Sequence, residues 1–311
     1  MPGDASFLSY AQNREDVVLW RALGDVPAGR YVEVGANHPK DDSATRAFYD
    51  HGWSGITVEP MPDFAEAHRA ERPRDTLVEA VITDADVSTV VLHEVPGTGL
   101  STVVDQIGQK HADGGQTVVD RTVAAMSLAA VLEANGGLDQ EVHFMLVDTE
   151  GFEAHVLASV DLTVFRPWVL VIESTAPNSV EQTHGAWEPA VLAAGYEFCL
   201  FDGLSRFYVA AEHAERLREK LSYPACALDP FVDARAYEVW LDREQTLADL
   251  RRWRAEAMQQ WALAGQLATD SGESNDHALA AARAEIAALR ASTSWRVTRP
   301  LRAVSSRLGR R

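Results

Sequence analysis

The chain has 311 residues, of which 46% are hydrophobic and 24% are charged, and its formal net charge is −18. These proportions are ordinary for a globular protein, so a core of normal size can form. The strong negative charge argues against general nucleic-acid binding, which needs a basic surface.

Targeting features are also missing from the sequence. No stretch approaches the roughly 20 apolar residues that a membrane-spanning helix needs. Residues 1–16 contain no basic region followed by an apolar run, so a signal peptide is not expected. Only two cysteines, Cys199 and Cys226, are present, and reduced thiols are the default for such a chain. We therefore expect a cytoplasmic protein.

Five apolar, β-branched runs alternate with helical patterns between residues 31 and 174. Runs of this kind are typical of strands buried on both faces of a parallel sheet, and helices between them predict right-handed βαβ units. The predicted strands span 31–35, 54–60, 76–83, 142–149 and 167–174, and the helices between the first three span 43–52 and 62–72.

Two further runs, 196–201 and 205–210, are joined by the turn residues DGL and predict a closing antiparallel hairpin. The predicted fold class is therefore α/β, with a doubly wound, mostly parallel seven-stranded sheet. Segment 84–125 is less regular, and within it residues 88–95 and 116–125 are candidates for extra strands. They flank a Gly-rich loop, 97–102, which is either a lid or substrate-binding insertion or a plain connection.

The composition changes after about residue 233. Residues 233–267 are rich in helix formers and contain no proline, residues 269–276 predict a break, and residues 277–291 predict a second helix. These helices form either a coiled coil with few, imperfect heptads or a pair that packs back on the domain. From Arg290 onward the chain has seven arginines and no acid.

We predict a domain at 1–232, a helical or coiled-coil extension at 233–291 and a basic tail at 292–311. The tail interleaves Trp295 and other apolar residues with arginines. Such a segment can rest on an anionic membrane surface, and the alternative is a disordered, solubilising end.

The first predicted strand ends in Glu33, Gly35 and Asn37. A glycine there allows a ligand to approach the carboxyl edge of the sheet, where open α/β sheets bind ligands. The GxGxxG fingerprint is absent, so a cofactor without a pyrophosphate fits better than NAD or FAD. Glu59 ends the second strand, where an acid can accept hydrogen bonds from both ribose hydroxyls of a nucleoside. The alternative for Glu59 is a solvated turn residue before Pro60.

Four segments in this order resemble the FkbM-type family of S-adenosylmethionine-dependent methyltransferases. They are SYAQNREDVVLW (9–20), YVEVGANHPKDDSATRAFYDHGWSGITVEP (31–60), GLST (99–102) and LVDTEGFEAHVL (146–157). The resemblance covers about residues 9–210 and implies a class I methyltransferase fold with S-adenosyl-L-methionine as cofactor.

The same resemblance implies roles for single residues. Glu33, Gly35 and Asn37 would line the methionine side of the cofactor, and Glu59 would hold its ribose. Gln12 and Asp16 match the family's N-terminal Q-x-x-x-D pattern, which would cover the cofactor.

Two carboxylates at strand ends are candidates for the chemical step. Asp148 follows the fourth predicted strand and Glu173 ends the fifth, so both face the crevice at the carboxyl edge. Asp148 is the first candidate for the base that withdraws a proton from an acceptor hydroxyl. Its alternative role is a helix N-cap or a hydrogen bond to the cofactor or the loop backbone. Together the two carboxylates bind Mg²⁺ or share acid/base work. His38 is a further candidate base, whereas Glu150 is assigned to a helical first turn.

The resemblance thus implies O-methyl transfer to a sugar hydroxyl of a cell-envelope polysaccharide, glycolipid or glycosylated metabolite. The C-terminal helices and basic tail would contact the inner membrane face or glycan-assembly proteins. Three alternatives stay open: an acceptor carboxylate or amine on a small molecule, a non-catalytic nucleoside-binding scaffold module, and a NAD-linked oxidoreductase, which the missing GxGxxG disfavours.

Overall fold

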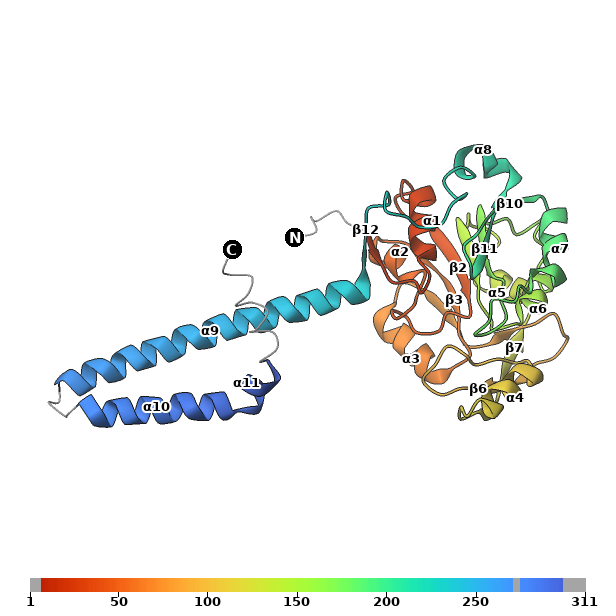
Figure 1. Ribbon diagram of the computed structural model, residues 1–311. Coiled ribbons are helices and arrows are strands. Elements are labelled where there is room, and N and C mark those ends of the chain that lie inside the picture. Colours follow the sequence, from red (N-terminus) through yellow and green to blue (C-terminus); the bar gives the residue numbers. More distant parts are fainter. Residues whose placement is uncertain (1–6, 271–274, 299–311) are drawn as a thin grey trace. The chain divides into compact units, whose positions relative to one another are not determined.

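The computed structural model describes residues 7–270 and 275–298 (Figure 1). The chain divides into two compact units, Met1–Tyr237 and Glu238–Arg311. The first unit holds the sheets, and the second consists of helices in its described part.

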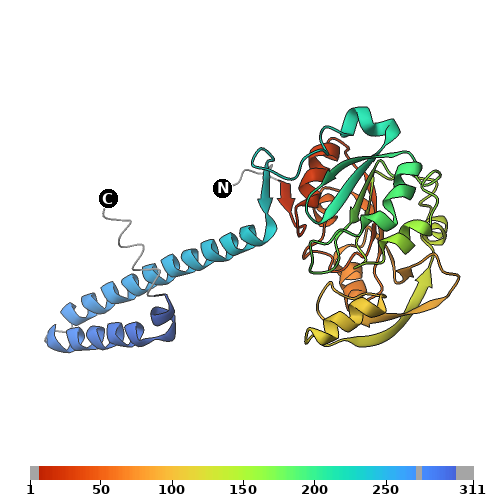
Figure 2. The same cartoon turned by 45° about the vertical axis from the view of Figure 1, so that its right-hand side comes forward.

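A seven-stranded sheet forms the centre of the first unit, in the order β10-β11-β9-β8-β2-β3-β4 (Figures 1 and 2). Neighbouring strands from β9 to β4 are parallel, while β11 runs antiparallel to both β9 and β10. The predicted mostly parallel sheet with an antiparallel closing hairpin is therefore confirmed. The strands are β2 (Arg30–Val34), β3 (Ser54–Val58), β4 (Thr76–Val78), β8 (Phe144–Val147), β9 (Val169–Glu173), β10 (Tyr196–Phe201) and β11 (Ser205–Ala210).

Helices cover both faces of this sheet. Val32 and Val34 join one core with residues of α5 (Leu128–Ala134), α6 (Glu153–Ala158) and α7 (Glu188–Ala193). Tyr31 points the other way and packs in a second core with residues of α1 (Glu15–Leu23) and α2 (Arg46–Asp50). Because successive strand residues alternate between two buried faces, the strands are apolar throughout. The remaining helices of this unit are α3 (Pro62–Glu71), α4 (Asp105–Asp113), α8 (Ala214–Leu217) and two 3₁₀ turns at His184–Ala186 and Ala211–His213.

The predicted strand at 76–83 is wrong as a single element. It is two short strands in different sheets, β4 and β5 (Val81–Ile82). The Ala80 N–H donates to the Val78 carbonyl at 3.2 Å, and this tight turn ends β4. β5 pairs with β7 (Val119–Met126), which also pairs with β6 (Thr89–Glu94). The extra strands predicted at 88–95 and 116–125 are thus present as β6 and β7.

The helical extension begins with α9 (Ala234–Asp270), directly after β12 (Phe231–Asp233), which pairs in parallel with β1 (Phe7–Ser9). In the second unit, α10 (Asn275–Ala291) lies beside α9 and runs antiparallel to it in both views, and α11 (Thr293–Val297) follows (Figures 1 and 2). The coiled coil stays a prediction. Residues 271–274, which are half of the predicted break, and the basic tail from residue 299 onward lie outside the described residues. In the described part of the chain, no helix is long and apolar enough to cross a membrane.

The centre of the sheet is a topological switch point, since the chain leaves β2 toward β3 and later returns to β8 on the other side of β2. The Asp148 N–H donates to the Val34 carbonyl at 3.0 Å. Gly35 has a φ of 83°, and an added Cβ would lie 1.7 Å from the Asp148 carbonyl oxygen. Only glycine fits where the two strand ends meet.

Gly35→Ala should therefore destabilise the fold far more than the same substitution at a glycine that has a similar φ but no close neighbour. Gly52 is the matched control, because its φ is 90° and an added Cβ meets nothing within 4 Å. We expect Gly52→Ala to lower the free energy of unfolding by about 1–2 kcal/mol, and Gly35→Ala to cost at least about 2 kcal/mol more. Urea denaturation measures both, and equal losses would contradict the close approach.

Candidate functional site

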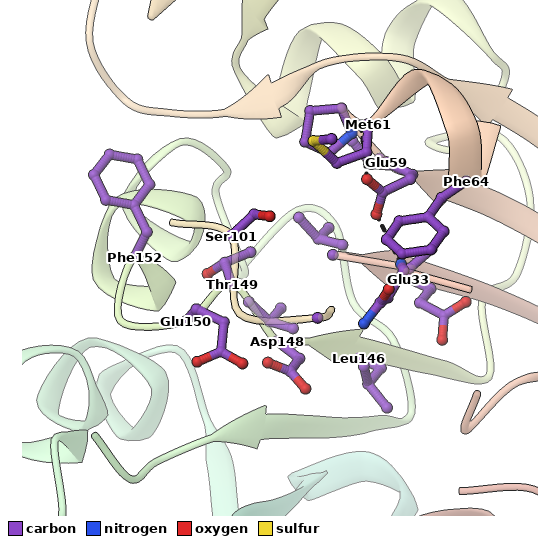
Figure 3. Close-up of a pocket in the computed structure, with 18 of the residues that line it drawn as sticks. Glu33, Glu59, Met61, Phe64, Ser101, Leu146, Asp148, Thr149, Glu150 and Phe152 are labelled. Carbon is purple, nitrogen blue, oxygen red and sulfur yellow. Dashed lines mark hydrogen bonds between the residues drawn. The ribbon is translucent and has the colours of Figure 1, made fainter. Parts of the chain in front are cut away.

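A cavity of about 280 Å³ opens at the carboxyl edge of the sheet, at the switch point. It is lined by the segments that follow β2, β3 and β8 and by the loop after β6. Figure 3 shows Asp148 and Glu150 on one side of the cavity and Glu59, Met61 and Phe64 on the other. The position is the one at which open α/β sheets bind ligands.

Glu33 and Asn37 frame the β2 end of the cavity. Glu33 is buried, and its carboxylate accepts a hydrogen bond from the Thr45 hydroxyl at 2.6 Å, with the Arg72 guanidinium 3.7 Å away. Burial raises the pKa of Glu33 to about 7, although Arg72 opposes this shift. Asn37 takes a left-handed φ of 51°, an uncommon backbone conformation that is typical of functional sites.

Glu59 is fixed in place by two backbone groups. Its Oε2 accepts a hydrogen bond from the Asn37 N–H and its Oε1 accepts one from the Met61 N–H, each at 2.7 Å (Figure 3). Each carboxylate oxygen keeps a second lone pair for a ligand donor. Burial raises the pKa of Glu59 to about 7. Glu59 is thus a buried, oriented acceptor and not a solvated turn residue.

The Gly-rich loop predicted between the extra strands lines the cavity from Thr98 to Val103. The Thr102 hydroxyl donates to the Glu150 carbonyl at 2.9 Å, which joins this loop to the segment after β8. Gly99 lies so close to the side chain of Asn37 that an added Cβ would be 2.2 Å from the Asn37 Nδ2. Of the two interpretations offered by the sequence, the structure favours the cavity-forming insertion over the plain connection.

Asp148, Glu150 and Glu173 meet at the β8–β9 end. Each offers one carboxylate oxygen, and these three oxygens lie within 4.8 Å of one another. Asp148 and Glu150 line the cavity, whereas Glu173 is not among its lining residues. Burial is the largest cause that raises the pKa of each carboxyl, and the charge of Asp148 raises those of Glu150 and Glu173 further.

Besides Glu173, two predicted site residues lie outside the cavity lining. Asp16 is fully buried, and its carboxylate accepts hydrogen bonds from the Ser9 hydroxyl and from the backbone N–H groups of Tyr10 and Ala11. His38 accepts the backbone N–H groups of residues 40 and 41 at its Nδ1, so its ring caps a turn. The other predicted residues line the cavity or, for Glu173, contact Asp148: Gln12, Glu33, Gly35, Asn37, Glu59 and Asp148.

Two acids that line the cavity, Glu15 and Glu150, are not among the site residues predicted from the sequence. Glu15, next to the motif residue Asp16, lines the cavity, and burial followed by repulsion from Asp202 raises its pKa to about 8. Glu150 precedes α6 and has a left-handed φ of 53°, so it is not part of the helical first turn assigned to it. The conformation of a single residue before a glycine has no signature in the hydrophobic pattern.

The cavity is strongly acidic. Its lining includes six carboxylic acids and, among the described residues, no lysine, arginine or histidine. The acids are Glu15, Glu33, Asp42, Glu59, Asp148 and Glu150. A cationic or neutral ligand therefore suits this site better than an anionic one.

A doubly wound sheet of this strand order, with its cavity at the switch point, is the class I methyltransferase fold. Residues 33–198, more than half of the chain, match the Methyltransferase FkbM domain, and the chain belongs to this family. The family predicted from the sequence motifs is confirmed. No curated protein matches the chain.

Solved structures give distant similarities. A TehB-like SAM-dependent methyltransferase from Corynebacterium glutamicum is 9% identical, with a TM-score of 0.34 over 62% of this chain and 87% of that one. Magnesium protoporphyrin IX methyltransferase from Synechocystis PCC 6803 with bound SAM is 9% identical, with a TM-score of 0.34 over 63% and 77%. CalO1, a methyltransferase in calicheamicin biosynthesis in its SAH-bound form, is 14% identical, with a TM-score of 0.31 over 63% and 53%. At these scores the matches carry no argument about cofactor or substrate.

The buried acids predict how stability depends on pH. Glu33 and Glu59 have pKa values raised to about 7, and Glu15 to about 8, from an ordinary value of 4.5. The folded state thus holds protons that the unfolded chain releases, so this stabilisation is complete below pH 4.5 and is lost as the pH rises through 7 to 8.

We expect the melting temperature of the ligand-free protein to fall by at least about 2 °C between pH 6 and pH 8.5. Differential scanning fluorimetry measures it, and Glu15→Gln, which cannot ionise, should flatten the profile. A constant or rising melting temperature in the unmutated protein would show that these acids titrate normally.

Proposed function

We propose that this protein is an S-adenosylmethionine-dependent O-methyltransferase that methylates a sugar hydroxyl. The observation that carries the proposal is the acidic cavity at the switch point, in a chain of the FkbM methyltransferase family. The acceptor would be part of a cell-envelope polysaccharide, a glycolipid or a glycosylated metabolite.

Two features of the cavity favour this cofactor over NAD. Glu59 is held by two backbone N–H groups, and its free lone pairs suit the ribose hydroxyls. Among the described residues, the lining has no basic side chain that would repel the positive sulfonium of this cofactor. A pyrophosphate would bring negative charge into a lining that has no basic side chain.

The bound cofactor would supply an electrophilic methyl group. The methyl group would be transferred to the acceptor oxygen, and S-adenosylhomocysteine would be the second product. The hydroxyl proton would pass to Asp148, which lines the cavity. A base helps because a neutral sugar hydroxyl is a poor nucleophile. Asp148 and Glu173 are also the candidate ligands for Mg²⁺.

The acidic lining also distinguishes a carboxylate acceptor from a hydroxyl acceptor. A carboxylate acceptor would enter among carboxylic acids without a cation to pair with, which costs free energy. A hydroxyl acceptor is neutral and can donate a hydrogen bond to any of these acids. The cavity thus supports a hydroxyl over a carboxylate, and the sugar class is taken from the family resemblance.

We further propose that the helical extension and the basic tail bring the enzyme to its partner at the cytoplasmic face of the membrane or in a glycan-assembly complex. The support is the run of seven arginines without an acid from Arg290 onward. Clustered arginines attract anionic lipid headgroups.

Calorimetric titration of the purified protein with S-adenosylhomocysteine should show micromolar binding, with NAD as the control and little or no binding of it. Glu59→Gln should weaken S-adenosylhomocysteine binding at least about tenfold, because an amide replaces one acceptor oxygen with a donor. Unchanged affinity in this variant would remove Glu59 from the ribose site, and a preference for NAD would overturn the proposed cofactor.

Asp148→Asn should lower methyl transfer at least about 100-fold, because an amide cannot accept the hydroxyl proton. Its affinity for S-adenosylhomocysteine should stay within about twofold, since the proton acceptor acts only in the chemical step. The assay follows radiolabelled methyl groups from S-adenosylmethionine into soluble glycosides and extracted glycans. Glu133→Gln, on the exposed side of α5, is the matched control and should keep full activity.

Near-normal turnover of Asp148→Asn would exclude Asp148 as the base. Tight cofactor binding by the unmutated protein without transfer to any glycan pool would favour the non-catalytic scaffold.

A further inference from the structure

Asp148, Glu150 and Glu173 come from two neighbouring strand ends, β8 and β9, and form one cluster, which we name the three-carboxylate cluster. One oxygen from each residue lies within 4.8 Å of the other two. Oxygens on opposite sides of a six-coordinate Mg²⁺ are about 4.2 Å apart, given Mg–O distances of about 2.1 Å. Separations of up to 4.8 Å exceed this distance by at most about 0.6 Å, so small side-chain shifts would bring all three oxygens onto one small divalent cation.

The hydrogen bonding of the cluster is incomplete. Glu173 is only 6% exposed, and its Oε2 has no hydrogen-bond partner in the described part of the chain. The Oε2 of Glu150 is buried and equally without a partner there. Buried carboxylate oxygens almost always find a donor or a cation, because leaving one unpaired costs free energy. Two such oxygens in one cluster point to a ligand that both can bind.

The backbone at Glu150 supports the same conclusion. Its φ of 53° places a non-glycine residue in the left-handed region, directly before Gly151 with a φ of 95°. Such strained conformations persist where the surrounding structure enforces them, and they concentrate at functional sites. In Figure 3 the carboxylates of Asp148 and Glu150 lie next to each other and point the same way. The left-handed turn thus places the Glu150 carboxylate beside that of Asp148.

Protonation of these acids does not give every buried carboxylate oxygen of the cluster a hydrogen-bond partner. A proton shared between Asp148 and Glu173 would still leave the buried Oε2 of Glu150 without a hydrogen-bond partner in the described part of the chain. No basic side chain lines the cavity beside the cluster within the described residues. A buried group of acids without a basic partner is the usual protein environment of a hard cation.

We propose that the three-carboxylate cluster binds one divalent cation, Mg²⁺ or Mn²⁺, and that Glu150 is the third ligand beside Asp148 and Glu173. Three protein oxygens leave further coordination positions open on the cavity side, where an acceptor hydroxyl can enter. Bound there, a hydroxyl would lose its proton more readily. This last role rests on the proposed methyltransferase function, whereas cation binding does not.

The test titrates the full-length protein with Mn²⁺ alone. Binding is measured by electron paramagnetic resonance as the decrease in the signal of free Mn²⁺. The unmutated protein should bind one Mn²⁺ per chain, in competition with Mg²⁺. Glu150→Gln should weaken Mn²⁺ binding at least about tenfold, as loss of even an outer-shell partner does, while S-adenosylhomocysteine binding by calorimetry stays within about twofold. Preserved binding of S-adenosylhomocysteine also shows that this variant is folded.

Glu59→Gln is the matched control, because Glu59 is a buried, cavity-lining acid outside the cluster. It should bind Mn²⁺ normally, whatever its effect on S-adenosylhomocysteine. Absence of Mn²⁺ binding to the unmutated protein, or equal Mn²⁺ affinity in Glu150→Gln, would overturn the cation site. A third outcome separates the two proposals. If the unmutated protein binds Mn²⁺ but not S-adenosylhomocysteine, and Glu150→Gln abolishes Mn²⁺ binding, the cation site stands and the proposed cofactor is rejected.

Discussion

The contact between the ends of β2 and β8 is the constraint on which the site depends. Gly35 approaches the Asp148 carbonyl so closely that no side chain fits between them, and the Asp148 N–H bonds to Val34. This contact brings two chain segments, far apart in sequence, to one edge of the sheet. The residues after β2 and β3 then form one wall of the cavity, and the residues after β8 form the other.

The two walls differ in whether a positive charge lies beside their buried acids. At the β2 wall, Arg72 is fully buried and donates hydrogen bonds to Tyr31, Thr45 and Asp75, and it lies near Glu33. This guanidinium offsets part of the desolvation cost of Glu33. At the β8 wall, no basic side chain lines the cavity near Asp148 and Glu150 among the described residues. At the β2 wall, the positive charge of Arg72 thus compensates the buried acid Glu33. At the β8 wall, the described lining residues offer no positive charge to compensate Asp148 and Glu150.

The insertion between β5 and α5 gives the cavity its third wall. The β6–β7 pair carries the Gly-rich loop, which contacts both other walls through the close approach of Gly99 to Asn37 and the hydrogen bond from Thr102 to the Glu150 carbonyl. Since the same peptide unit holds the strained Glu150, the loop also helps to fix the direction of that carboxylate. An acceptor would thus meet a site shaped jointly by the sheet and the insertion.

The sequence by itself determined the sheet, its hairpin and the residues that end its strands, because burial on both faces leaves continuous apolar runs that can be read locally. It also singled out Gly35, Asn37, Glu59 and Asp148, which line the cavity and whose order along the chain follows the strand ends. Only the tertiary structure decided that 76–83 splits between two sheets, that Asp16 and His38 bond to their own backbone neighbours, and that Glu150 meets Glu173. These outcomes depend on single φ angles and on contacts between distant segments, neither of which leaves a periodic trace in the sequence.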